Sequence, residues 1–322
     1  MHSDTETENR EPMLVFGGSG SPRLTRAICD YLGVSVGRNE TIRFSDGNIF
    51  VRILETVRGR RVYVVQSTAF PTNDNFMELL FWNDAFRRAS AEKITVVMPY
   101  FSYAKGDKKD EPRVSIRGRV CAEAIEMSGA DRVVTVDLHS PQVSGFFRIP
   151  VDDLYALPVI ADHVRAQGFR DLVVVSPDIG FAKQARKFAR ALGAPVAIAE
   201  KERMCHDEHA HFIDLIGDVR GKTALIVDDF TATAGTIISV TDALLDHGAT
   251  EVYAAVTHGV LTNGAAAKVN ASRLKELIIT DSVETHPGPI LGRIRVLSIA
   301  PLLGEAIRRI HNRESMSDLF PY

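Results

Sequence analysis

The chain has 322 residues, 45% of them apolar, and its 38 Lys and Arg against 41 Asp and Glu give a net charge of −3. This length is about twice that of a typical domain, so we expect two domains with full apolar cores. The near balance of charge gives no electrostatic reason to expect a nucleic-acid or membrane partner, and we predict neither.

The amino-terminal segment and the cysteines predict a cytoplasmic protein. Residues 1–12 are polar and acidic, unlike a signal peptide, and we expect a disordered tail there. No apolar run approaches the roughly 20 residues that a membrane helix needs. Cys29, Cys121 and Cys205 are scattered without a paired spacing, which is typical of reduced, cytoplasmic chains.

Strand-like and helix-like segments alternate along the first half of the chain, the pattern of a parallel sheet covered by helices. The expected strands are 13–16, 42–44, 62–65, 94–98 and 133–137, and the expected helices are 24–32, 77–88 and 122–127. The second half shows the same alternation of strand-like and helix-like segments. Its expected strands are 172–176, 196–198, 225–229, 252–256 and 277–279, with helices over 182–192 and from 237 onward.

The fold class is therefore α/β, with two similar units that each hold a mainly parallel sheet flanked by helices. We predict an amino-terminal domain over 13–149 and a carboxy-terminal domain over 150–304, with a hinge near 149–151. The segment 305–322 is a candidate to pack back on the first domain.

The most informative stretch is the strand that ends in Asp228 and Asp229. A loop of small and hydroxylated residues follows, and then a helix begins, so the loop lies where free backbone N–H groups and the helix dipole favour a phosphate. Gly235 allows a close backbone approach, and Thr233 and Thr236 can donate hydroxyls. Two carboxylates beside a phosphate repel it unless they also bind another group, such as a vicinal diol or a divalent cation. The alternative is a turn whose aspartates only cap the helix.

This stretch looks like the phosphoribosyl-diphosphate (PRPP) binding motif of phosphoribosyltransferases and PRPP synthetases. Further stretches, in the same order, resemble the ribose-phosphate diphosphokinases, which are the PRPP synthetases. They are 71–75 with 77–80, 99–103, 137–139 with Gln142 and 145–147, 176–178, and 314–317. The correspondence runs from about Val15 to Phe320.

The resemblance implies a fold, an activity and an assembly. Each domain would be phosphoribosyltransferase-like, and the enzyme would move the diphosphoryl group of ATP to the anomeric hydroxyl of ribose 5-phosphate, giving PRPP and AMP with Mg²⁺ as cofactor. It also implies a homo-oligomer, a hexamer in the family, with each active site shared between subunits. Regulation by phosphate and ADP at a subunit interface is implied as well, for which Ser315 and Ser317 are candidates.

The resemblance also assigns site residues to four roles. The ribose 5-phosphate site would comprise Asp228, Asp229, Thr233, Ala234, Gly235 and Thr236. The Mg²⁺ site would comprise His139 and Asp178, and the catalytic pair would be Lys201 and Arg203, following the strand 196–198. The ATP site would comprise Phe44, Asp46, Asn48, Lys105 and Asp110, with the residues after Phe44 supplied by a neighbouring subunit.

The chain departs from the family pattern mainly on the donor side. Lys105 and Gly106 stand where the family has Arg and Gln, so a bidentate guanidinium is replaced by a point charge. Asn48 stands where Glu is usual, Phe181 replaces a second Gly, and Ala232 replaces a third Asp. These departures leave open a catalytically weak regulatory paralog, and the PRPP-binding motif alone would also suit a phosphoribosyltransferase that consumes PRPP. The retained metal-site and catalytic residues favour an active synthetase.

Overall fold

The computed structural model describes residues 13–203, 211–262, 264–284, 286, 289–290 and 292–320, with the side chains of 201–203 and 211–213 left aside. The predicted tail at 1–12 lies outside these residues. Within them, no helix combines the length and apolar character needed to cross a membrane.

The first sheet has five parallel strands, and its three central strands are rich in buried β-branched residues. Their order is β1 (Leu14–Gly17), β4 (Arg61–Val65), β5 (Lys93–Met98), β6 (Arg132–Val136) and β7 (Val151–Leu154). An antiparallel hairpin of β2 (Asn39–Arg43) and β3 (Ile49–Ile53) stands apart from it. The helices of this half are α1 (Pro22–Leu32), α2 (Thr72–Arg88) and α3 (Arg117–Ser128), with short 3-10 turns η1 (Ser102–Lys105) and η2 (Pro141–Phe146).

The second sheet has seven strands, and only the β10/β9 pair is antiparallel. Their order is β10 (His211–Ile216), β9 (Val196–Arg203), β8 (Leu172–Ser176), β11 (Thr223–Thr231), β12 (Glu251–Gly259), β13 (Leu277–Thr280) and β14 (Ile294–Leu297). The helices are α4 (Leu157–Ala166), α5 (Ala182–Leu192), α6 (Gly235–Asp246), α7 (Ala265–Ala271) and α8 (Ala300–Asn312), followed by the 3-10 turn η3 (Ser317–Leu319). The predicted α/β class with two mainly parallel sheets is confirmed.

Two strand predictions were wrong in extent. The strand expected at 196–198 continues to Arg203, because β9 pairs along its length with β10. Lys201 and Arg203 therefore lie within a strand rather than after it. The strand expected at 42–44 is one arm of the β2–β3 hairpin. The predicted division at 149 and 150 stays a prediction; β7, directly after it, pairs with β6, so a boundary after Leu154 would keep the first sheet whole.

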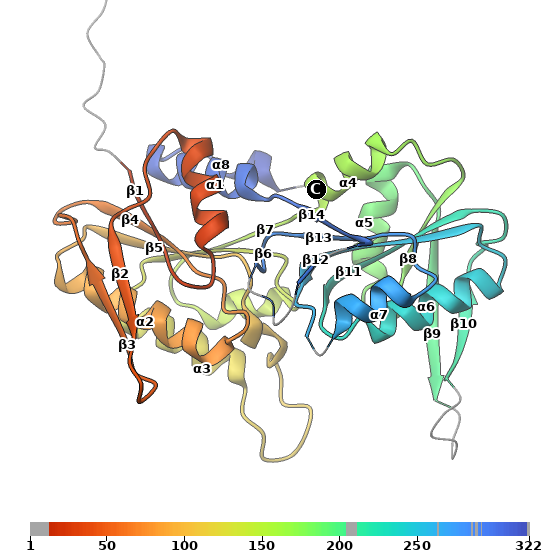
Figure 1. Ribbon diagram of the computed structural model, residues 1–322, viewed down its shortest axis with the longest axis horizontal. Helices are drawn as coiled ribbons and strands as arrows, with labels where there is room; N and C mark the ends of the chain where they lie inside the picture. The colour runs from red at the N-terminus through yellow and green to blue at the C-terminus, as the bar shows by residue number, and fades with distance from the viewer. Residues whose placement is uncertain are drawn as a thin grey trace, which may run out of the picture.

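One helical layer covers both sheets. A single apolar cluster joins Val15 of the first sheet and Leu225 of the second to α1, α4, α5 and α8, including Leu303. On the opposite faces, α2 and α3 cover the first sheet, and α6 and α7 cover the second (Figure 1). Burial of this shared apolar surface fixes the two sheets relative to each other. The carboxyl ends of their strands can therefore build one site.

Glu284, after β13, adds a polar link between the two halves. Its side chain is 4% exposed and accepts hydrogen bonds from the backbone N–H of Arg23, at 3.0 Å, and of Leu24, at 3.2 Å. The Arg23 Nε also donates to it at 2.8 Å. Glu284 thus caps the first turn of α1, where backbone N–H groups have no partner within the helix.

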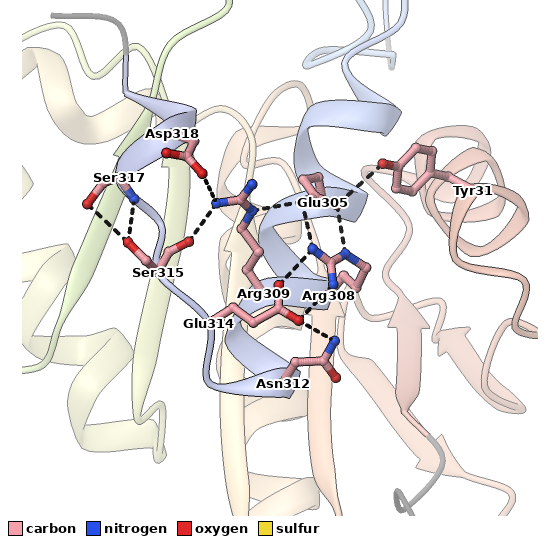
Figure 2. Close-up of polar contacts among 9 residues, drawn as sticks. All are labelled: Tyr31, Glu305, Arg308, Arg309, Asn312, Glu314, Ser315, Ser317 and Asp318. Atoms are coloured by element: carbon pink, nitrogen blue, oxygen red, sulfur yellow. Dashed lines mark hydrogen bonds and ion pairs between the residues drawn. The ribbon is translucent and has the colours of Figure 1, made fainter. Parts of the chain in front are cut away.

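The segment after α8 folds back on that helix through ion pairs (Figure 2). Glu305 accepts hydrogen bonds from Arg308 and Arg309, and Arg309 also contacts Asp318 at 2.9 Å. The hydroxyl of Tyr31 in α1 donates to Glu305 at 3.4 Å. The end of the chain is thereby attached to its beginning.

Ser315 and Ser317, the candidates for a regulatory site, lie in this segment (Figure 2). The Ser315 hydroxyl donates to that of Ser317 at 3.1 Å, and the Ser315 carbonyl accepts a hydrogen bond from Arg309 at 2.7 Å. Their role in binding phosphate or ADP stays a prediction.

Candidate active site

The acid pair lies where β11 leaves the core. Residues 224–227 are fully buried, and Asp228 and Asp229 follow at the carboxyl edge of the sheet, half-buried. The Asp229 N–H donates to Asp228 Oδ1 at 2.9 Å, and the Phe230 N–H donates to Asp229 Oδ1 at 2.8 Å. These bonds to the main chain fix the orientation of both carboxyl groups.

His139, from the first sheet, contacts this acid pair. It follows β6, and its Nδ1 lies 2.6 Å from Asp229 Oδ2. Because a carboxylate can only accept, Nδ1 carries the proton, and Nε2 is the ring nitrogen left for another partner. The predicted proximity of the imidazole and the second aspartate is confirmed by this bond, which joins residues 90 positions apart.

The charges of this cluster are strongly coupled. Burial, followed by the neighbouring charge of Asp229, raises the pKa of Asp228 to about 8. Burial alone would also raise the pKa of Asp229, but the hydrogen bond and charge of His139 lower it overall. The same hydrogen bond raises the pKa of His139. Two carboxyl groups held this close repel each other when both are ionised, and a cation placed beside them would offset that repulsion.

The segment that carries His139 is held from both sheets. Asp137 Oδ2 accepts hydrogen bonds from Thr257 Oγ1 in β12, at 2.6 Å, and from the Ala156 N–H, at 3.0 Å. Asp153 Oδ1 accepts one from the Leu138 N–H at 3.1 Å. Neither acid was assigned a role from the sequence. The sequence feature that could have indicated a role is Asp153, because it is a carboxylate inside a strand, β7.

His258 is a second buried link between the sheets. Its Nε2 donates to the carbonyls of Val136 and Asp137, at 3.0 and 3.2 Å, and its Nδ1 contacts Ser282 Oγ at 2.9 Å. Burial lowers its pKa to about 4, so the ring is neutral and acts as a brace. No local pattern indicates this role, because a His within a strand does not reveal which carbonyls lie beside it.

The loop after the acid pair has the form of an anion site. Ala234 adopts a left-handed conformation, φ 60°, directly before α6 begins at Gly235. Such a conformation is costly for a residue with a Cβ and is found where function requires it. Thr233, Gly235 and Thr236 are exposed, and the Gly235 N–H lies 3.4 Å from Thr233 Oγ1. The first N–H groups of α6 are thus accessible beside two hydroxyls.

Two further predicted residues reach the acid pair. Lys105, at the end of η1, places its Nζ 3.2 Å from the centroid of the Phe230 ring. Burial lowers its pKa to about 8, although Asp229 and Asp228 favour its charged form. Asp178 follows β8 and accepts a hydrogen bond from the Phe181 N–H at 2.9 Å, and its charge contributes to the raised pKa of Asp228.

A cleft of about 320 Å³ opens beside these groups. It is lined by residues from both halves, among them His139, Gln142, Gly180, Phe181, Asp228 and Asp229. Within the described part of the chain, no three His, Cys, Asp or Glu side chains lie close enough together to enclose a metal ion.

Other predicted residues are not brought to this cleft within the chain. Phe44, Asp46 and Asn48 form the tip of the β2–β3 hairpin, which lies away from the junction of the two sheets (Figure 1). There the Asn48 N–H and Nδ2 donate to Asp46 at 3.0 Å, which lowers the pKa of Asp46. Asp110 lies in an exposed loop. The side chains of Lys201 and Arg203 are outside the described residues, so their role stays a prediction.

The buried acids predict a pH-dependent stability. Burial raises the pKa of Asp137 to about 6, and burial with the charge of Asp137 raises that of Asp153 to about 7. An unfolded aspartate titrates near 3.9, so the stabilisation from these protonated acids is complete below that pH and is lost as pH rises through 6 and 7. We expect the free energy of unfolding to fall by roughly 3 kcal/mol between pH 5 and pH 8 through these groups.

Calorimetry in metal-free buffer checks this expectation. Asp153→Asn keeps the acceptor for Leu138 and should flatten the dependence on pH. Asp152→Asn, in the same strand but paired with Arg132, is the matched control and should leave the dependence intact. An Asp153→Asn variant with the full slope would contradict the expectation.

Comparison with known proteins points to one family. A family model for the N-terminal domain of ribose phosphate pyrophosphokinase matches residues 13–129, and one for the phosphoribosyl synthetase-associated domain matches residues 204–321. The chain is 48% identical over 310 residues to the ribose-phosphate pyrophosphokinase of Rhizobium meliloti, covering 96% of this chain and 100% of that protein. It is 47% identical over 307 residues to that of Caldanaerobacter subterraneus, covering 95% and 97%.

A solved structure agrees with these relatives. The crystal structure of phosphoribosylpyrophosphate synthetase from Mycobacterium smegmatis superimposes with a TM-score of 0.88 at 37% identity, covering 94% of this chain and all of that one. The resemblance inferred from the motifs is confirmed over nearly the whole length. The chain belongs to the ribose-phosphate pyrophosphokinase family.

Proposed function

We propose that this ribose-phosphate pyrophosphokinase transfers the diphosphoryl group of ATP to the anomeric hydroxyl of ribose 5-phosphate, forming PRPP and AMP, with Mg²⁺ as cofactor. The observation that carries the proposal is the hydrogen bond between His139 and Asp229, which joins the two sheets at the mouth of an anion-binding loop. This arrangement offers one place for a sugar phosphate and a triphosphate to meet.

The acceptor binds at the end of β11. The first N–H groups of α6, with Thr233 and Thr236, hold the 5-phosphate, since a helix N-terminus and hydroxyls both donate to phosphate oxygens. Ala234 and Gly235 supply the backbone of this cradle. Asp228 and Asp229 accept hydrogen bonds from the ribose hydroxyls, which fixes the anomeric carbon relative to the donor.

The cation binds beside the acid pair. The fit rests on two adjacent, largely buried carboxyl groups: burial and the charge of Asp229 raise the pKa of Asp228, and a divalent cation would offset that repulsion. His139, through Nε2, and Asp178 would hold Mg²⁺ directly or through water. Bound there, the ion would neutralise charge on the diphosphoryl oxygens.

The donor side draws on residues of two kinds. Lys105 provides a cation next to the acid pair, and Lys201 and Arg203 of β9 stabilise charge on the migrating group. Phe44, Asp46, Asn48 and the loop carrying Asp110 bind ATP. Because the hairpin tip lies away from the acid pair of its own chain, we assign it to the site of a neighbouring copy in a homo-oligomer, a hexamer as the family resemblance implies.

The proposal includes a cytoplasmic location. Cys29 and Cys121 are buried and form no disulfide, which suits a reducing compartment.

A donor screen tests the proposed function. Purified protein with ribose 5-phosphate, Mg²⁺ and each of ATP, dATP, GTP and CTP should yield PRPP and a nucleoside monophosphate, with ATP the best donor. Lys201→Ala should lower the rate by at least about 10²-fold, as loss of one charge-stabilising group does. Lys268→Ala, exposed on α7, is the matched control and should be unchanged.

The alternatives give different results. No product with any donor, together with copurification of a similar active chain, indicates a regulatory subunit. Release of diphosphate from PRPP with a purine or pyrimidine base indicates a phosphoribosyltransferase.

A further inference from the structure

Phe230 directly follows the acid pair, and its ring contacts two other side chains of the site. Lys105 Nζ lies over the ring face, 3.2 Å from the centroid. His139 meets the ring edge-on, with centroids 5.5 Å apart and planes at 80°. Phe230 has none of the roles assigned so far, yet both Lys105 and His139 contact it.

The position of the ring is fixed by its strand. Phe230 belongs to β11, pairs with His258 of β12, and donates its N–H to Asp229 Oδ1. It therefore moves with the acid pair. Lys105, in contrast, ends a 3-10 turn that follows β5 of the first sheet. The contact between Lys105 and Phe230 connects the donor-side turn of one sheet to the acceptor strand of the other.

The Lys105 ammonium needs a contact that fixes its position. An ammonium on a flexible four-carbon stem has many rotamers, and fixing it costs conformational entropy. The face of an aromatic ring carries a negative potential that attracts a cation, more strongly where water is partly excluded. Lys105 is half-buried, so the ring replaces some of the hydration that its ammonium has lost.

We propose that Phe230 is a positioning residue for the donor: its ring face holds the Lys105 ammonium beside the acid pair, where the diphosphoryl group reaches the acceptor. This inference rests on the proposed function. The cation is in place before ATP arrives, so ATP binding does not have to order it. Loss of the ring should then weaken the use of ATP and leave the use of ribose 5-phosphate nearly unchanged.

Initial-rate kinetics of three variants test this split. Phe230→Leu keeps an apolar side chain but removes the ring face, and should lower kcat/KM for MgATP about tenfold. The KM for ribose 5-phosphate should stay within about twofold, and calorimetric binding of ribose 5-phosphate shows that the variant is folded. Phe230→Tyr restores the ring and should recover most of the loss. Phe81→Leu, half-exposed on α2, is the matched control.

A double-mutant cycle identifies Lys105 as the partner. If the ring acts through the ammonium, Phe230→Leu should change kcat/KM for MgATP by less than about twofold in a Lys105→Met background. Additive losses, equal effects on both substrates, or no recovery in Phe230→Tyr would each overturn the assignment. A parent chain that forms no PRPP contradicts the proposed function, and with it this inference; an active parent and an unchanged Phe230→Leu contradict the inference alone.

Discussion

Asp229→Asn is expected to lower kcat/KM for ribose 5-phosphate by about 10²- to 10³-fold, the range for removal of one preorganised polar group at a reaction centre. Asp229 accepts a hydrogen bond from His139 Nδ1 and at the same time faces the cleft with Asp228. An amide of the same shape carries no charge and offers one acceptor oxygen, so it cannot serve the imidazole and a ribose hydroxyl equally.

The measurement is PRPP formation with varied ribose 5-phosphate at saturating MgATP. The pKa of His139 should also fall in the variant, because the hydrogen bond to Asp229 is what raises it. Asp162→Asn, whose side chain is 75% exposed on α4, is the matched control. A loss below about fivefold would mean that Asp229 does not contact the acceptor.

Glu284→Ala should lower the free energy of unfolding by about 3 kcal/mol, since it removes a buried carboxylate that accepts several hydrogen bonds. The backbone N–H groups of Arg23 and Leu24 would lose their acceptor, and the two halves would lose this polar link. Arg23→Ala should cost less, because its guanidinium is largely exposed and the N–H groups of α1 would keep their cap.

Scanning calorimetry measures this effect, and a fall in Tm of several degrees is expected for a 3 kcal/mol loss. Glu123→Ala on α3 is the matched control: its ion pair with Arg119 is exposed and contributes little. A Glu284→Ala variant with the same Tm as the parent would show that water replaces the cap without loss of stability.

The parts of the fold that the sequence predicted are those with local causes. Buried, largely apolar runs such as 133–136 and 224–227 predict parallel strands, because both faces of such a sheet are covered. Asp228 and Asp229 followed by small residues predict an anion loop, because strand, loop and helix are contiguous. His139 was placed correctly because strands of this class gather their ligands at one edge.

The parts that were missed depend on contacts distant in sequence. The length of β9 is set by its pairing with β10, so the polar residues at its end wrongly indicated that the strand ended earlier. Thr257 and His258 lie inside a strand, where nothing local shows that they meet Asp137 from the other sheet. The contact of Lys105 with Phe230 joins a 3-10 turn and a strand that no periodicity connects.

The covering that both sheets share bears on how the protein is made. Leu303 and Ile307 of α8 belong to the same cluster as Leu24 and Ile28 of α1, although α8 leaves the ribosome long after α1. A nascent chain with the five strands of its first sheet already paired would still expose this apolar surface. The C-terminal half thus covers apolar surface of the N-terminal half. Premature termination before residue 300 leaves that surface exposed on a product that chaperones and proteases can recognise.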